Sequence, residues 1–129
     1  MAYTEVQIAE IAALNDLARA AMGVTSKVVM TQGIAALDDA TRSRIFELVE
    51  TFNDFTPDND PHGERDVGFL YRDASGQWRT RWTSEVEKPA LSVMWKIDYY
   101  DRALEFGSEE PWNPQVTKRV LTILLASEY

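Results

Sequence analysis

The sequence predicts an α+β fold, with three helices packed on one face of a mostly antiparallel sheet of about four strands. Apolar residues recur at helical spacing near both ends of the chain, and they alternate with a period of two in the middle. Turn signals rich in Gly, Pro and Asp separate these segments, with no internal repeat or linker. Because 129 residues is the size of one ordinary domain, we expect residues 1–129 to form a single α+β domain.

Two helices and one strand are expected in the first half of the chain. Residues 4–7 match a capping box, so a helix is predicted from about Glu5 to Met22. The run 27–31 is rich in β-formers, and Gly33 is expected to end that short strand. An aspartate at 38–39 should cap the second helix, because the apolar residues that follow it lie on one helical face.

Three further strands and a last helix are expected in the second half. Residues 67–71, 78–82 and 93–99 alternate between apolar and polar positions, which predicts an antiparallel meander with one buried and one wet face. Asn113 and Pro114 are a favoured N-cap and first-turn pair. The apolar run 116–125 that follows them is therefore predicted to be a deeply buried helix.

Charge and composition exclude several classes of function. The net charge is −8, and it repels the phosphates of nucleic acid. With no cysteine, the chain has no disulfide, thiolate nucleophile or Cys-based zinc site. The first residues do not resemble a secretory signal, and no apolar run is long enough to span a membrane. We therefore expect a cytoplasmic protein.

The acidic residues are concentrated in two segments. Residues 47–66 hold seven carboxylates against one arginine, and residues 98–110 hold five against one. Solubility alone would explain an acidic surface. The second interpretation is an acidic face that binds a basic partner.

The loop Asp58–Asp66 contains carboxylates at nearly the spacing of a calcium loop: Asp58, Asp60, Glu64 and Asp66. Position 12, where a bidentate glutamate is needed, is Phe69, and Pro61 stiffens position 4. A structural turn held by side-chain-to-backbone bonds is the other interpretation, and no metal site is assigned. His62, the sole histidine, would be a proton shuttle or a solvated side chain.

A second polar constellation lies on the run 95–102. Its wet face would carry Lys96, Asp98 and Tyr100 beside Arg79 and Arg81 of the neighbouring strand. Cross-strand ion pairing is the simpler interpretation. The other is a binding face on which Tyr100 is an amphipathic anchor.

Residues 54–64, 95–101 and 120–126 together resemble a bacterial family known as domain of unknown function 3768. The resemblance extends from Leu14 to Tyr129. In that family we expect a histidine at the position of Arg65 and an aromatic residue at that of His62. The resemblance implies a cytoplasmic accessory protein, often carried on mobile elements, with no established activity.

These observations favour a non-enzymatic protein that binds a basic protein surface. One such class is a mobile-element inhibitor of a host defence complex, similar to an anti-CRISPR protein, that occupies a surface built for nucleic acid. The alternative is a small metal-assisted hydrolase that uses the Asp58–Asp66 loop. A third possibility is a scaffold acting through exposed tryptophans. No catalytic residue or cofactor is assigned, and the candidate binding residues are Asp58, Asp60, His62, Glu64, Asp66, Asp98, Tyr100, Asp101, Glu109 and Glu110.

Overall fold

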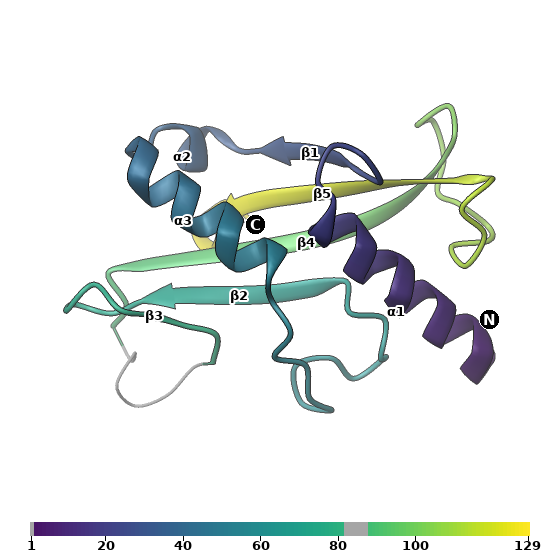
Figure 1. Cartoon of the computed structure of the whole chain (residues 1–129), viewed down its shortest axis with the longest axis horizontal. Coiled ribbons are helices and arrows are strands. Elements are labelled where there is room, and N and C mark those ends of the chain that lie inside the picture. The colour runs from purple at the N-terminus through teal and green to yellow at the C-terminus, as the bar shows by residue number, and fades with distance from the viewer. Residues whose placement is uncertain (1, 82–87) are drawn as a thin grey trace.

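The computed structural model describes residues 2–81 and 88–129. Its helices are α1 (Glu5–Ala20), α2 (Gln32–Ala35), α3 (Asp39–Glu50) and the 3-10 turn η2 (Ala126–Glu128). Its strands are β1 (Lys27–Met30), β2 (Val67–Arg72), β3 (Trp78–Arg79), β4 (Leu91–Asp101) and β5 (Thr117–Leu125). They form one sheet in the order β1-β5-β4-β2-β3, in which only β1 and β5 run parallel (Figure 1). The α+β class and the mostly antiparallel sheet are thus confirmed.

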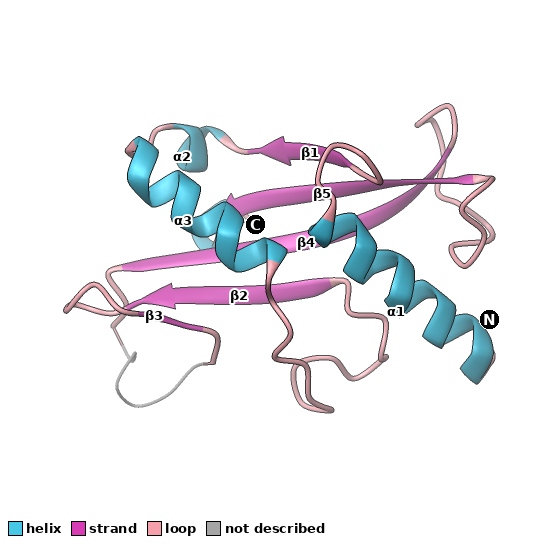
Figure 2. Cartoon of the chain, viewed as in Figure 1, coloured by secondary structure: helices cyan, strands magenta, loops and turns pink. Residues whose placement is uncertain are grey.

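The two long helices begin where the sequence predicts. Thr4 Oγ1 accepts a hydrogen bond from Gln7 N at 3.1 Å, and Thr4 N donates to Gln7 Oε1 at 2.9 Å, which completes the capping box of α1. Asp38 accepts from Thr41 N at 3.1 Å and caps α3. Both helices lie over the same face of the sheet (Figure 2). In the part of the chain that is described, no helix has the length and apolar character needed to cross a membrane.

The helix predicted over residues 116–125 is wrong, because this segment is β5, an interior strand between β4 and β1. Leu121 and Ile123 are fully buried against the helices, and Leu124, on the opposite face, is 4% exposed. A run that is apolar on both faces fits a buried strand as well as a buried helix. Asn113 makes a turn instead of a helix cap, since its Oδ1 accepts from Gln115 N at 3.0 Å.

The meander order is also wrong. β2 lies between β3 and β4, so β3 is at the edge of the sheet and does not pair with β4. Its described pairing covers Trp78 and Arg79, and Trp82 lies outside the described residues. Gly33 does not simply end a strand, because it lies within α2. A Cβ there would lie 2.5 Å from Leu125 Cδ1, so glycine allows α2 to pack closely against this side chain of β5.

The core fills the space between the sheet and its helices. Burying each of its larger apolar side chains contributes about 1.5–3 kcal/mol. The apolar core residues with no exposed surface are Ile11, Ala18, Ile34, Ile45, Val49, Leu70, Val93, Trp95, Leu121 and Ile123. The polar residues Asn15, Arg19 and Arg119 are among those that are also at most 4% exposed. They connect the core to the candidate site.

Candidate functional site

The loop between α3 and β2 is held by its own polar side chains. Asn59 Nδ2 donates to the carbonyl of Asp54 at 2.7 Å, and Asn59 Oδ1 accepts from Thr56 N at 2.7 Å. Asp60 Oδ1 accepts from Arg65 N at 3.2 Å. These are the side-chain-to-backbone bonds of a structural turn.

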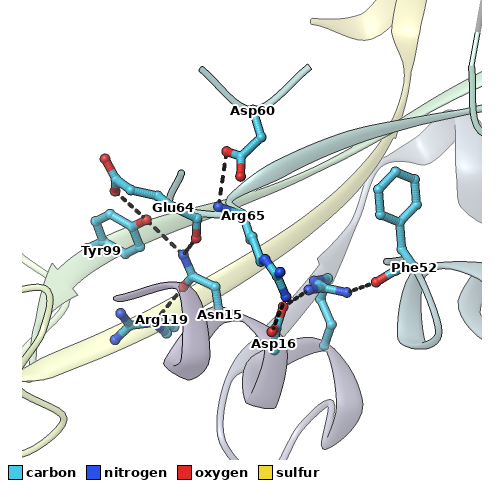
Figure 3. Close-up of polar contacts among 9 residues, drawn as sticks. Asn15, Asp16, Phe52, Asp60, Glu64, Arg65, Tyr99 and Arg119 are labelled. Carbon is cyan, nitrogen blue, oxygen red and sulfur yellow. Dashed lines mark hydrogen bonds and ion pairs between the residues drawn. The ribbon is translucent and has the colours of Figure 1, made fainter. Parts of the chain in front are cut away.

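Asn15 of α1 anchors the end of this loop (Figure 3). Its Nδ2 donates to the Glu64 carbonyl and to the Tyr99 hydroxyl, both at 2.9 Å, and its Oδ1 accepts from Arg119 Nε at 2.7 Å. Tyr99 in turn donates to the Glu64 carboxylate at 2.8 Å. Burial raises the pKa of Tyr99, so the phenol stays protonated and able to donate. The loop is therefore tied to one helix and two strands.

Arg19 supplies a second anchor. Its Nη1 donates to the Phe52 carbonyl at 2.5 Å, and its guanidinium lies 4.9 Å from the centre of the Trp95 ring. Asp16 joins Arg19 to the loop, because it pairs with Arg19 and accepts from Arg65 Nη1 at 2.8 Å. Burial lowers the pKa of Arg19. A charged side chain buried in this way fixes the loop relative to α1, since a misplaced loop would leave the charge unpaired.

Sequence reasoning missed Asn15, Arg19 and Arg119 as partners of the loop. Asn15 lies on the buried face of α1 together with Ile11 and Ala18. A polar residue at such a position is the available signal, because a buried amide needs hydrogen-bond partners. Its partners, Glu64, Tyr99 and Arg119, lie far away in sequence.

The carboxylates of the Asp58–Asp66 loop do not converge. Asp58 is exposed, whereas Asp60 and Glu64 accept the hydrogen bonds described above. Asp66 is half-buried, and burial followed by the nearby Glu64 raises its pKa. Across residues 2–81 and 88–129, no group of three or more His, Asp or Glu side chains is placed to hold a metal ion. His62 is exposed on the loop. The hydrolase alternative stays a prediction.

The expected neighbourhood of the second constellation is wrong. Lys96 and Asp98 pair with each other on β4, and Tyr100 lies opposite Lys118 of β5. Arg79 and Arg81 are not beside them, because β2 separates β3 from β4.

The arginines near β3 have their own acidic partners. Arg79 pairs with Asp73 at 3.3 Å. Arg81 Nε donates to Asp54 at 2.7 Å, and this hydrogen bond lowers the pKa of Asp54 to about 2. The bond between Arg81 and Asp54 ties the loop to the segment after β3.

The first turns of α1 contact the loops that carry both acidic segments. A Cβ on Gly63 would lie 3.4 Å from Ile8 Cγ2, and the rings of Tyr3 and Trp112 meet edge to face at 5.7 Å. Trp112 follows Glu109 and Glu110 in the β4–β5 loop. Glu5, in the first turn of α1, and the Glu109–Glu110 pair, just before Trp112, are therefore brought to the N-terminal end of this helix, and we call this region the acidic end. Its exposed carboxylates are Glu5, Glu109 and Glu110.

An exposed aromatic ring lies within the second acidic segment. Phe106 is 71% exposed, between Glu105 and the Glu109–Glu110 pair. Asp101 helps to shape this loop, since its Oδ1 accepts from Glu105 N at 2.9 Å and its N–H donates to the Phe106 carbonyl at 2.8 Å. By contrast, Trp95 is fully buried and Trp78 is half-buried, so neither offers the tryptophan face that the scaffold hypothesis requires.

The fold and this surface define a small α+β protein with an acidic end supported by a buried polar network. The chain belongs to the family described as "Protein of unknown function (DUF3768)", which matches residues 30–128. The resemblance found in the sequence is thereby confirmed over residues 30–128, from the last residue of β1 to η2, and α1 precedes the matched region. No curated protein and no solved structure matches the chain.

Proposed function

We propose that the chain is a binding protein whose acidic end docks on a basic surface of a protein partner. The observation that carries the proposal is the contact of Tyr3, just before α1, with Trp112, because it brings Glu5 beside the loop that holds Glu109 and Glu110. Phe106 is exposed in the same loop. In a chain with a net charge of −8, this arrangement concentrates charge at one place on a rigid support.

The acidic end combines the two ingredients of a protein interface. Glu109 and Glu110 form no ion pair with any described residue, so their charge is available to attract and orient a basic partner. Exposed charges accelerate association more than they strengthen it. Phe106 would supply the buried apolar area, as aromatic anchors do at interface centres.

In its finer form, the proposal is that the partner surface normally holds nucleic acid, as in a host defence complex. Lysines and arginines placed for phosphates also attract carboxylates, so an acidic protein can occupy the same channel. The chain would then act as a competitive inhibitor without binding nucleic acid itself.

The test compares charge reversals that change the net charge equally. A partner is captured from a lysate after nuclease digestion, and its association with each variant is measured by surface plasmon resonance. One variant carries Glu109→Lys with Glu110→Lys, and the matched control carries Asp39→Lys with Glu50→Lys, two exposed acids of α3. Glu64 is left unchanged because its carboxylate accepts from Tyr99.

We expect the acidic-end variant to associate at least about tenfold more slowly than the wild type in low salt, and the α3 control to lose much less. The wild-type rate should fall as salt rises, because exposed charges are screened over about 8–10 Å. Phe106→Ala should mainly accelerate dissociation. Binding that is indifferent to salt and to both reversals, but abolished by Tyr100→Ala, would contradict the proposal and indicate the sheet face instead.

A further inference from the structure

A pocket of about 240 Å³ lies where β5 extends past the start of β1. β1 pairs with β5 from Lys27 opposite Val120, so residues 117–119 have no β1 residue beside them (Figure 1). The pocket walls come from α1, the turn after it, β5 and the β4–β5 loop. The lining residues that carry the argument are Leu17, Val24, Arg102, Lys118 and Arg119.

Arg119 is the buried cation of this pocket. It is 4% exposed, and two of its nitrogens are fixed, since Nε donates to Asn15 Oδ1 at 2.7 Å and Nη2 to the Pro111 carbonyl at 2.6 Å. Nη1 has no hydrogen-bond partner among the described residues, and no described carboxylate forms an ion pair with this guanidinium. The guanidinium also lies 5.0 Å from the centre of the Tyr99 ring, so Asn15, Pro111 and Tyr99 hold the buried charge in place and leave Nη1 able to donate to an anion.

Two further cations line the same pocket. Neither Arg102 nor Lys118 forms an ion pair with any described residue, although the chain has 21 acidic side chains. Three cationic residues therefore line one pocket and form no ion pair with a described carboxylate, although Lys118 and Arg119, as consecutive residues of β5, project from opposite faces of the strand. Guanidinium groups bind carboxylates and phosphates through paired hydrogen bonds.

The backbone of β5 adds potential donors. The Ile123 carbonyl accepts from Thr31 N, just after β1, so odd-numbered residues of β5 direct their backbone groups toward β1. The backbone groups of successive residues in a strand point alternately to its two sides. Those of Thr117 and Arg119 therefore point to the same side as those of Ile123, where β5 extends past the start of β1. Next to these polar groups, Leu17 is 48% exposed and Val24 is 83% exposed, so the pocket also has an apolar wall.

We propose that this pocket binds a small organic anion. Its carboxylate or phosphate lies at the open edge of β5, between Arg119 on one face of the strand and Lys118 on the other, with Arg102 beside them. Its short apolar body covers Leu17 and Val24. The volume accommodates a body of a few carbon atoms and excludes a large cofactor. The site is independent of the proposed acidic docking surface, so either can fail without the other.

The test is an NMR titration of the full chain, following the amides of residues 117–119 and the Arg119 Nε–H. Hexanoate and butyl phosphate are the probes. Acetate and inorganic phosphate measure the binding of the charged group alone, and 1-hexanol measures the binding of the apolar body alone. We expect saturable shifts with hexanoate or butyl phosphate, about tenfold tighter than with the corresponding small ion. The head group that binds more tightly identifies the ligand as a carboxylate or a phosphate ester.

Variants separate a site from general charge attraction. Arg102→Gln with Lys118→Gln should weaken binding at least about tenfold, because both cations leave the pocket. Lys27→Gln with Lys88→Gln removes the same charge from exposed positions outside the pocket and should leave the affinity unchanged. Failure to saturate by about 50 mM of either probe, equal binding of 1-hexanol, or equal weakening in the control would overturn the proposal.

Discussion

Asn15 Oδ1 and Arg119 Nε are joined by a 2.7 Å hydrogen bond between α1 and β5. Because the same amide donates to the Glu64 carbonyl and the Tyr99 hydroxyl, one side chain supports the acidic loop, the sheet and the cationic pocket at once. Asn15 is fully buried, so a hydrogen bond lost from its side chain cannot be replaced by a hydrogen bond to water in the folded protein.

We expect Asn15→Ala to lower the free energy of unfolding by about 2–4 kcal/mol. The substitution leaves the buried Arg119 guanidinium and the Tyr99 hydroxyl short of partners. Urea denaturation measures the loss, and Glu10→Ala, an exposed change on the same helix, should stay within about 0.5 kcal/mol of the wild type. A loss below about 1 kcal/mol would show that the network contributes little.

We expect Gly68→Ala to destabilise the fold by about 1–3 kcal/mol, the usual cost of overpacking a core. A Cβ at this position would lie 2.5 Å from Trp95 Nε1, and Trp95 has no exposed surface into which it can move. Thermal denaturation followed by tryptophan fluorescence measures the effect. Gly107→Ala is the matched control, because its nearest neighbour would be 3.9 Å away. Equal stability of the two variants would argue against the tight contact.

We expect Asp66→Asn to stabilise the protein at pH 7. The native pKa of Asp66 is raised, chiefly by burial and then by Glu64. Folding therefore favours the protonated carboxyl, and this residue's contribution to stability declines as pH rises from about 3.9, its unfolded pKa, through the raised native pKa. The side-chain amide of Asp66→Asn carries no charge at any of these pH values, so the variant does not lose this part of the stability as pH rises.

The measurement is urea denaturation of the wild type and Asp66→Asn between pH 3 and pH 7. The difference between them should be largest at pH 7 and vanish near pH 3, where the carboxyl is protonated in both states. A variant less stable than the wild type at pH 7 would mean that the Asp66 charge is stabilised in the fold.

Short-range signals explain which elements were predictable. The capping box at Thr4 and the cap at Asp38 place α1 and α3 because helix initiation depends on neighbouring residues alone. Period-two alternation places β2 and β4 for the same reason. The candidate site was predictable only as acidic segments, since charge can be counted along a sequence but the contacts of Ile8 and Tyr3 cannot.

The sequence by itself determined the α+β class, the two capped helices, the alternating strands and the acidic excess, because local backbone preference and composition encode them. Tertiary structure alone decided that residues 117–125 form a strand, since a run apolar on both faces satisfies a helix or an interior strand, and pairing with β1 and β4 selects the strand. It also decided the partners of Asn15 and Arg119, which lie 104 residues apart. Buried polar groups must find partners wherever the chain brings them, and no local pattern records that choice.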